Sequence, residues 1–363
     1  MLSYIIWNAS PDIFTLPIPF LDKELTLRWY GLLFASGFLI SQQILYYIFK
    51  KEGKPEKDVD TLTIYMVIAT VIGARLGHVL FYEPERYFAN PIDIFKIWEG
   101  GLASHGAAVG ILFALWLYSR KKKPGQSYLQ TLDRIVILVA LTGALIRFGN
   151  FMNSEIIGKE THSNYGVVFA RNVSEILKSD GAVKEVSYVQ VDSASNQEGY
   201  RPIKILLEFD GQGPGSYNEY AQYIEGRVNS SLSYSPYVRE HIDQPGYVQY
   251  KVSQDENQKY YGIVSTYAIP RHPAQLYESI SCLFLFAFLL WLWTKSKEKL
   301  PEGRLFGIFL IVCFGLRFVY EFLKVNQVDF ENSLPLNMGQ FLSIPLVLAG
   351  IFILIRSYRK ANV

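Results

Sequence analysis

The chain has 363 residues, of which 50% are hydrophobic and 19% charged, and its mean hydropathy is +0.13. A soluble domain of this length carries more charge. The formal net charge is only +2, and no basic stripe or nucleic-acid-binding motif is present, so DNA and RNA are not expected partners. The composition therefore indicates a protein that lies in a lipid bilayer.

Apolar stretches recur along the chain, and a bilayer core needs about 20 such residues per helix. The seven predicted spans are Leu27–Phe49, Thr61–Phe81, Ala103–Tyr118, Leu129–Phe148, Gln275–Trp293, Leu305–Leu323 and Met338–Leu354. The third is short and begins within Gly100–His105. No basic stretch with a small-residue cleavage site precedes the first span, so we expect no removable signal peptide.

Basic residues lie in every second connection between these spans. They are Lys50, Lys51, Lys54 and Lys57; Arg120 to Lys123; Lys295, Lys297 and Lys299; and Arg356, Arg359 and Lys360. Because cytoplasmic loops carry the excess of lysine and arginine, this pattern predicts a cytoplasmic C-terminus and an N-terminus outside. Most of the aromatic residues at span ends, among them Trp29, Tyr82, Trp98 and Trp293, are expected to be interfacial anchors.

The connection 159–268 is polar, and its alternating runs Val183–Val191, Ile203–Phe209 and Tyr247–Val252 predict strands. We therefore expect an all-α polytopic membrane protein with a small mixed α/β or mainly β domain outside the membrane. Residues 1–158 would carry spans one to four, 159–268 the inserted head domain, and 269–363 spans five to seven.

Several ionisable side chains lie within the spans, where they are costly and usually face a partner, a cavity or a substrate. They are Arg75, His78, His105, Asp133, Arg134, Arg147, Arg317 and Glu321. Counting residues from the span ends places Arg147, Arg317, His105 and Tyr30 in the outer half of the bilayer. Guanidinium groups match phosphate geometry, and histidine moves protons near neutral pH, so these residues predict a site for an anionic lipid head group.

Structural roles compete with this interpretation. Arg317 and Glu321 have the i,i+4 spacing of a helical ion pair, Arg147 can extend to the interface, and His105 can be a packing residue. Asp133 and Arg134 fit a topological role at the cytoplasmic interface, and Arg75 with His78 is balanced between structure and function. The pair Gly73 and Gly77 favours close helix packing over chemistry.

The segment Arg147 to Glu155 closely resembles the signature R-x-G-N-F-x-N-x-E of bacterial prolipoprotein diacylglyceryl transferases. Five further segments agree with that family in order: Arg28 to Gly31, Gly100 to Gly106, Arg271 to Glu278, Arg317 with Glu321, and Met338 to Gln340. Six ordered motifs over about two thirds of the chain form a specific signal.

The resemblance implies transfer of the diacylglyceryl group from phosphatidylglycerol to the lipobox cysteine of a preprolipoprotein signal peptide. The products would be a thioether and glycerol phosphate, in the first step of lipoprotein maturation at the bacterial inner membrane. The family needs no metal or organic cofactor, and its spans enclose a central cavity open sideways to the lipid.

The resemblance also implies roles for individual residues. Arg147 and Arg317 fall where the family holds the phosphate, and His105 falls on its essential histidine, a proposed general base. Tyr30 completes the expected catalytic set. The expected substrate-binding residues are Arg147, Asn150, Asn153, Glu155, Gly158, Arg317, Glu321, His272 and Arg75, and Asp133 also occupies a family position.

The chain departs from the family pattern in places, and other functions compete. The insert is longer than the family leads us to expect, Lys324 replaces a frequent arginine, and Cys313 replaces a tyrosine of some members. A transporter or channel would spread polar residues through the membrane depth and show inverted repeats. A seven-span receptor rests on span count alone, and an intramembrane protease lacks a readable nucleophile.

Overall fold

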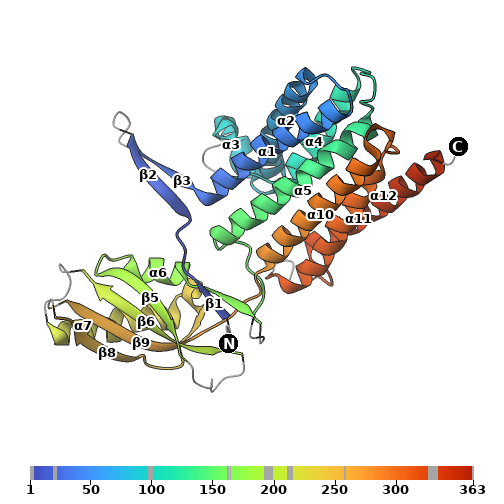
Figure 1. Ribbon diagram of the computed structural model, residues 1–363. Helices are drawn as coiled ribbons and strands as arrows, with labels where there is room; N and C mark the ends of the chain where they lie inside the picture. Colours follow the sequence, from blue (N-terminus) through green and yellow to red (C-terminus); the bar gives the residue numbers. More distant parts are fainter. Residues whose placement is uncertain are drawn as a thin grey trace. The chain divides into compact units, whose positions relative to one another are not determined.

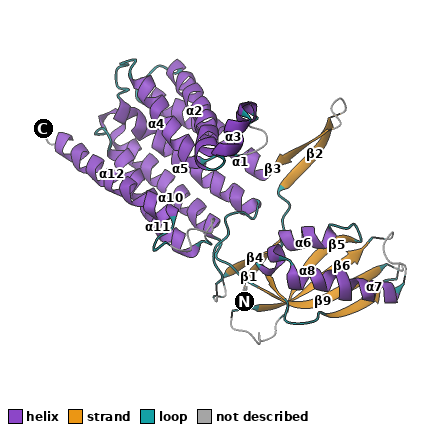
Figure 2. Ribbon diagram, turned by 180° about the vertical axis from the view of Figure 1, so that it is seen from behind, coloured by secondary structure: helices purple, strands orange, loops and turns teal. Residues whose placement is uncertain are grey.

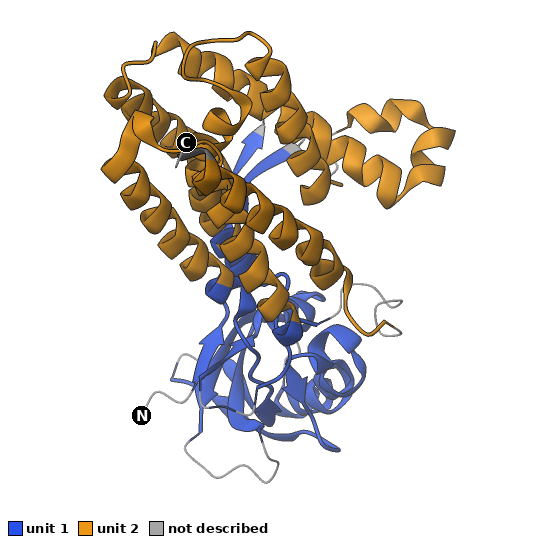
Figure 3. Cartoon of the chain, turned by 90° about the vertical axis from the view of Figure 1, so that its right-hand side faces the viewer, with its two compact units in different colours: residues 1–30, 148–277, 322–333 blue, residues 31–147, 278–321, 334–363 orange. Residues whose placement is uncertain are grey.

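The structure is a computed structural model that describes residues 4–18, 23–96, 101–161, 163, 165–191, 199–210, 216–256, 259–325 and 334–361. Gly100 and Trp98, which the sequence assigns to a motif and to an interfacial anchor, lie outside these ranges. The chain divides into two compact units (Figure 3). Unit 1 comprises residues 1–30, 148–277 and 322–333, and unit 2 comprises residues 31–147, 278–321 and 334–363.

Unit 2 is helical, and its long helices run side by side (Figure 1). The helices are α1 (Trp29–Lys51), α2 (Lys57–Phe81), α4 (Ser104–Ser119), α5 (Tyr128–Met152), α10 (Ala274–Ser296), α11 (Arg304–Tyr320) and α12 (Met338–Ala361), with short α3 (Pro84–Ala89), η1 (Pro91–Phe95), η4 (Lys297–Lys299) and η5 (Glu321–Leu323). In the described part of the chain, six helices are long and apolar enough to cross a membrane. The shorter α4 has 16 residues, a length of about 24 Å.

Each predicted span is a helix, and the structure refines the picture at two span ends. The first helix begins at Trp29 instead of Leu27, because Lys23–Arg28 forms strand β3. Trp293 is not an interfacial anchor: its side chain is fully buried and its indole N–H donates to Glu52. An aromatic residue at a span end can therefore belong to the helix core.

Glycines set the packing of α2 against α4. A Cβ on Gly106 would lie 2.3 Å from the carbonyl oxygen of Gly73, and one on Gly110 would lie 2.6 Å from that of Ala69. A Cβ on Gly77 would lie 2.7 Å from the Cα of Gly106. The two helix backbones are thus in direct contact, as the predicted packing role of Gly73 and Gly77 requires.

Unit 1 contains a five-stranded antiparallel sheet. Its strands are β5 (Val183–Gln190), β6 (Arg201–Phe209), β9 (Tyr260–Ala268), β7 (Ile242–Asp243) and β8 (Gln249–Gln254). Their order is β5-β6-β9-β7, and β8 also pairs with β9. The three predicted strands are confirmed as β5, β6 and β8, whereas β9, the central partner of three strands, was not predicted.

Short helices cover one face of this sheet (Figure 2). They are α6 (Arg171–Lys178), α7 (Tyr217–Tyr223), η3 (Ile224–Val228), α8 (Asn229–Tyr234) and α9 (Pro236–Arg239). Alternate residues of β6, including Ile203, Ile205 and Leu207, are buried against Val173 of α6 and Leu232 of α8. The period-two alternation of apolar residues therefore predicted these strands. The helices that cover the sheet make unit 1 mixed α/β.

The N-terminal residues also belong to unit 1. Strand β1 (Tyr4–Trp7) pairs in parallel with β4 (Gly166–Phe169), and β2 (Asp12–Ile18) forms a hairpin with β3. The unit is consequently wider than the segment 159–268.

Candidate functional site

The segment that follows Arg147 wraps around a carboxylate. Helix α5 ends at Met152, and the amides of Asn150 and Asn153 donate to the two oxygens of Glu155 at 3.3 and 3.1 Å. The side chain of Gln275 donates to the backbone carbonyl of Glu155. Two motifs distant in sequence, one after α5 and one at the start of α10, therefore fix Glu155 together.

The backbone on either side of Glu155 is strained. Ser154 has φ 54° and Ile156 has φ 55°, in the left-handed region that a β-branched residue rarely adopts. Such strain persists where the surrounding contacts impose it, and it is frequent at functional sites. The strained pair turns the chain sharply at the carboxylate.

Gly158 is required by a close backbone approach. A Cβ at this position would lie 2.3 Å from the carbonyl oxygen of His272, which accepts a hydrogen bond from the Gly158 N–H at 3.1 Å. The Gly158 carbonyl accepts from Arg271 at 3.3 Å. Burial lowers the pKa of His272, whose Nδ1 lies 3.3 Å from the Tyr277 hydroxyl. In this geometry Gly158 is a packing residue that holds His272 in place.

Tyr30 packs against the signature segment. A Cβ on Gly149 would lie 3.0 Å from Tyr30 Cδ2 and 3.2 Å from its Cα. The glycine thus lets the start of α1 lie against the last turns of α5. This contact explains why a tyrosine and a glycine recur in two separate motifs.

Arg147, on α5, forms an ion pair with Glu278 on α10. Its Nε lies 2.5 Å from Glu278 Oε2, and the two side chains are 24% and 8% exposed. Next to this pair the helices are joined by a hydrogen bond from the Ser279 hydroxyl to the Ala144 carbonyl, at 2.8 Å. Glu278 lay within a recognised motif and a predicted span but was not assigned to the site; its charge at that position was the available signal.

Arg317, on α11, is held loosely. Its Nε lies 3.6 Å from Glu321 Oε1, beyond hydrogen-bonding distance, and has no hydrogen-bond partner among the described residues. Glu321 is positioned by Asn337, whose amide donates to it at 3.2 Å, and by Gly339, where a Cβ would lie 2.6 Å from its carboxyl carbon. The carboxylate is fixed while the guanidinium retains donor capacity.

The two arginines lie on helices of unit 2 that pack together. Residues of α5, α10 and α11, among them Ile137, Leu289 and Leu310, pack in one buried cluster. The helices that carry Arg147 and Arg317, α5 and α11, therefore share one buried core with α10.

His105 lies in the first turn of α4 and is partly buried. Its ring lies 5.3 Å from that of Phe81 and 5.8 Å from that of Tyr82, measured between centroids. The turn before it is tied to α2 by a hydrogen bond from Ala103 N–H to the Ala74 carbonyl. The aromatic contacts orient the imidazole, but no described contact joins it to Arg147 or Arg317.

Arg75 differs from the other predicted site residues. Its guanidinium donates to the backbone carbonyls of Asp93, Ile94, Lys96 and Gly101, and its residue is 3% exposed. It also lies 4.8 Å from the centre of the Tyr87 ring. This geometry favours a role in anchoring the loop between α2 and α4, and a substrate-binding role for Arg75 stays a prediction.

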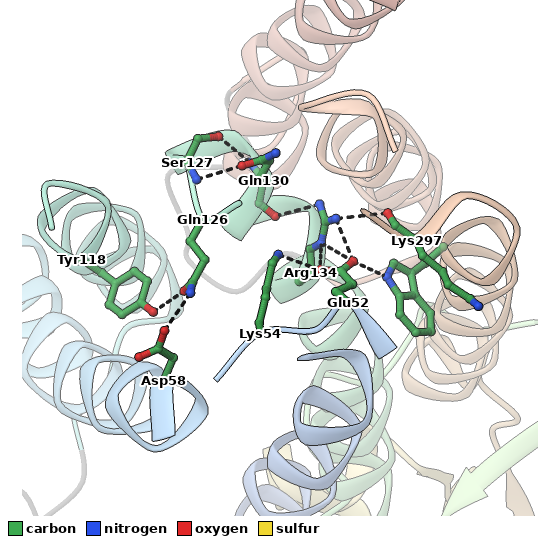
Figure 4. Close-up of polar contacts among 10 residues, drawn as sticks. Glu52, Lys54, Asp58, Tyr118, Gln126, Ser127, Gln130, Arg134 and Lys297 are labelled. Carbon is green, nitrogen blue, oxygen red and sulfur yellow. Dashed lines mark hydrogen bonds and ion pairs between the residues drawn. The ribbon is translucent and has the colours of Figure 1, made fainter. Parts of the chain in front are cut away.

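Asp133 and Arg134 lie near the opposite end of α5, where Arg134 belongs to a buried polar cluster (Figure 4). Asp133 accepts hydrogen bonds from the backbone N–H groups of Gly303 and Phe306, at 2.7 and 2.8 Å, and so caps the N-terminus of α11. Arg134 pairs with Glu52 at 2.8 Å, and both side chains are almost fully buried.

Glu52 is the centre of this cluster. It also accepts from the Trp293 indole at 2.7 Å and pairs with Lys54 at 2.6 Å. Burial would raise the pKa of the Glu52 carboxyl, but Arg134, Lys54 and Trp293 together hold it below its ordinary value. The connections α1–α2 and α10–α11 thereby meet the start of α5.

The predicted site residues fall into two sets. Tyr30, Asn150, Asn153, Glu155, Gly158 and His272 belong to unit 1, and Arg75, His105, Arg147, Arg317 and Glu321 belong to unit 2. Within unit 1, contacts join Glu155 to both asparagines and Gly158 to His272. Gln275 and Tyr277 were missed as supporting residues, although both lie in the motif that begins at Arg271.

Comparison with known proteins agrees with these motifs. The family described as prolipoprotein diacylglyceryl transferase matches residues 17–356. A phosphatidylglycerol–prolipoprotein diacylglyceryl transferase of Tolumonas auensis is 35% identical over 356 residues, which cover 98% of each chain. Proteins of the same name from Chloroherpeton thalassium and Porphyromonas gingivalis are 35% and 32% identical, over 99% of this chain and 97% and 96% of their own.

The near-complete alignment with these relatives corrects the expectation that the insert 159–268 is unusually long. The Tolumonas relative aligns over nearly the whole of both chains, so the segment 159–268 is not an unusual extension of this chain. The match extends through both units and all the recognised motifs. The chain belongs to the prolipoprotein diacylglyceryl transferase family.

Proposed function

We propose that this chain transfers the diacylglyceryl group of phosphatidylglycerol to the lipobox cysteine of a preprolipoprotein signal peptide. The observation that carries the proposal is the pair of partly exposed arginines, Arg147 and Arg317, on two helices of the bundle, α5 and α11, that share one buried core. Guanidinium groups with spare donors in such a position suit a lipid phosphate. The names of the relatives supply the two substrates.

The reaction forms one C–S bond and breaks one C–O bond. The thiolate of the substrate cysteine attacks the glycerol carbon that carries the phosphate ester, and glycerol phosphate leaves with the bonding electrons. A thiol must lose its proton to attack. His105 is the proposed base, and the proton passes from it to solvent or to the leaving phosphate.

Arg147 and Arg317 act on the charge that develops on the phosphate oxygens as the C–O bond breaks. Donors fixed before the reaction stabilise that charge more than they stabilise the bound lipid. Glu278 and Glu321 keep the two guanidinium groups in place, and Asn337 in turn holds Glu321.

The unit 1 residues have supporting roles in this proposal. Tyr30 and Asn150 orient the lipid, and Asn153 holds Glu155 beside them. Gly158 allows the backbone approach that places His272. Catalysis needs no metal or organic cofactor in this scheme.

We further propose a seven-span topology in the bacterial inner membrane, with the N-terminus and the 159–268 head outside and the C-terminus in the cytoplasm. In unit 2 the connections α1–α2 and α10–α11 and the start of α5, near which the basic residues lie, meet at Glu52 and Arg134. Positive charge gathered at one end supports a cytoplasmic end. Cysteines placed at Lys299 and Tyr247 should be labelled by an impermeant maleimide only from the inside and outside, respectively.

A mass measurement tests the reaction. Purified protein is incubated with phosphatidylglycerol vesicles and a peptide containing a lipobox cysteine, and the peptide is expected to gain one diacylglyceryl group. A peptide with serine in place of the cysteine should not react. Absence of the adduct with folded protein would overturn the proposal, and a transporter would give no covalent product at all.

Two variants separate the roles. Arg147→Ala should remove most of the activity, whereas Arg120→Ala, which changes an exposed arginine outside the site, should leave it intact. His105→Gln should lower the rate without weakening lipid binding if the imidazole is the base. Full activity of His105→Gln at normal expression would exclude that role.

A further inference from the structure

Strands β1 and β4 form a two-stranded parallel ribbon (Figure 2). Because side chains of a strand alternate between its faces, the ribbon contacts a different hydrophobic core on each face. On one face, Tyr4 and Val168 belong to the large core of the sheet in unit 1. On the other face, Phe169 of β4 belongs to a smaller core, and Trp7 of β1 packs against it. The ribbon therefore joins the sheet to this smaller core.

The smaller core lies beside the turn that carries Glu155. Phe151 precedes this carboxylate in the signature segment and is buried in the core, and Ile157 follows it and packs against the same core. Leu276 packs there too, next to Gln275, whose side chain donates to the Glu155 carbonyl. A strained backbone persists only where surrounding contacts impose it. This core supplies such contacts on both sides of the strained turn.

Trp7 contacts the signature segment directly. Its ring lies 4.5 Å from that of Phe151, measured between centroids, whereas the ring of Phe169 lies 5.9 Å from Phe151. Phe151 directly follows Asn150, whose carbonyl accepts a hydrogen bond from the Glu155 N–H at 2.9 Å. A displacement of the Phe151 ring would therefore move both the amide that faces Glu155 and the carboxylate itself.

The backbone of Trp7 is fixed from the side of the sheet. Its carbonyl accepts a hydrogen bond from the Ala170 N–H at 2.9 Å, and the side chain of Asn8 donates to the Val186 carbonyl of β5 at 3.3 Å. The indole N–H of Trp7 is buried without a hydrogen-bond partner in the described part of the chain. An unpaired buried donor does not stabilise a fold, so the side chain contributes through its ring.

We propose that Trp7 is a positioning residue for lipid binding. Through its contact with Phe151 it holds Asn150 and Glu155 in the geometry that binds phosphatidylglycerol. The inference rests on the proposed function, in which Asn150 orients the lipid. Trp7 lies outside every recognised motif, so a packing contact rather than a sequence signature brings the N-terminal strand to the site.

Steady-state kinetics in mixed micelles test this role. Trp7→Ala leaves a gap beside Phe151 and should raise the KM for phosphatidylglycerol about tenfold, because the binding geometry is no longer held. The kcat should stay within about threefold, since a poorly folded variant would instead lower kcat at an unchanged KM. Ile5→Ala, at a residue of the same strand that is 55% exposed, is the matched control and should change both constants less than about twofold.

Trp7→Phe separates the ring from the indole N–H. This variant keeps an aromatic ring against Phe151 and removes the unpaired donor, so its KM for phosphatidylglycerol should lie within about twofold of the parent value. A KM as high as that of Trp7→Ala would show that the indole N–H itself is needed, and would overturn positioning through Phe151.

Hydrogen exchange provides a measurement that does not depend on catalysis. The N–H groups of Ser154 and Glu155 are hydrogen-bonded within the turn, at 3.0 and 2.9 Å. In Trp7→Ala, peptides that cover this turn should exchange about tenfold faster than in the parent, and in Ile5→Ala they should not. Unchanged exchange in Trp7→Ala, or a KM equal to that of Ile5→Ala, would overturn the inference. An inactive parent would overturn the proposed function alone, because faster exchange would still show that Trp7 holds the turn.

Discussion

The two ends of unit 2 differ in how far their arginines are buried and how closely they are paired with carboxylates. At the end with the basic connections, Arg134 is 3% exposed in its side chain and is paired with Glu52, which has three polar partners. At the other end, Arg317 is 36% exposed and its nearest carboxylate oxygen lies 3.6 Å away. A guanidinium whose donors are mostly engaged by the protein, as in Arg134, serves packing, whereas one with spare donors can bind an anion.

We call the end that contains Arg134 and Glu52 the sealed end. Mutations there should reduce the stability of the protein more than mutations at the other end do. Glu52→Ala leaves Arg134 buried without a counter-charge and should reduce the free energy of unfolding by about 3–5 kcal/mol. Thermal unfolding of the purified protein measures the loss, and Glu56→Ala, at an exposed carboxylate in the same connection, is the control. A loss for Glu52→Ala no larger than that of the control would break the comparison.

At the other end, which contains Arg317 and which we call the open end, a mutation should reduce activity more than stability. Arg317→Ala removes a phosphate ligand in the proposed reaction and should lower the transfer rate about 10²–10³-fold, the usual effect of deleting one transition-state donor. Its unfolding temperature should stay near the parent value, because Arg317 forms only a long ion pair and Glu321 keeps Asn337. Normal activity, or loss of folding, would show that Arg317 is a structural residue.

His241 in unit 1 extends the comparison to a buried group that lacks a counter-charge. Burial, with a contribution from Arg271, lowers its pKa from 6.5 to about 4, and its Nδ1 has no hydrogen-bond partner among the described residues. The folded state therefore binds fewer protons, so stability is complete above pH 6.5 and falls as the pH decreases toward 4. The total loss is about 3 kcal/mol.

Unfolding temperatures recorded between pH 7 and pH 4 measure this effect. In His241→Gln the decrease with falling pH should be smaller than in the parent protein, because the titrating group is absent. Parallel curves for the two proteins would assign the acid sensitivity to other groups.

The smallest expected effect concerns the helix cap at the sealed end. Asp133→Asn keeps one acceptor oxygen for α11 but loses the negative charge at the helix N-terminus, which should cost about 1 kcal/mol of stability. Glu56→Gln, a neutral change at an exposed site, should have no measurable effect on the unfolding temperature. A large loss of activity in folded Asp133→Asn would instead indicate a functional role.

Hydropathy predicted the helices well because the bilayer sets their length and composition. Hydropathy could not place the start of α1, because an apolar residue followed by a basic one, such as Leu27 and Arg28, fits a strand as well as a helix end. Strands with clear alternation were predicted, whereas β1 and β4 are short and pair across most of the first half of the chain. Their pairing depends on long-range contacts that no local pattern contains.

The site was predictable where residue type fixes the chemistry, and less so where geometry does. Arginine and histidine in a membrane span indicate function wherever they lie, which singled out Arg147, Arg317 and His105. The partners of Arg75 are backbone carbonyls, which have no sequence signature. Glu278 was missed, although a carboxylate past the first turn of α10 and within a predicted span was a signal of function.

The glycine contact between α2 and α4 bears on the membrane itself. In the proposed topology α4, about 24 Å long, crosses a hydrocarbon layer of about 30 Å. Locked backbone to backbone on its neighbour, it cannot slide to reduce this hydrophobic mismatch. Local thinning of the bilayer is one response to a short span, and in this topology it would bring water and head groups closer to the imidazole in the first turn of α4.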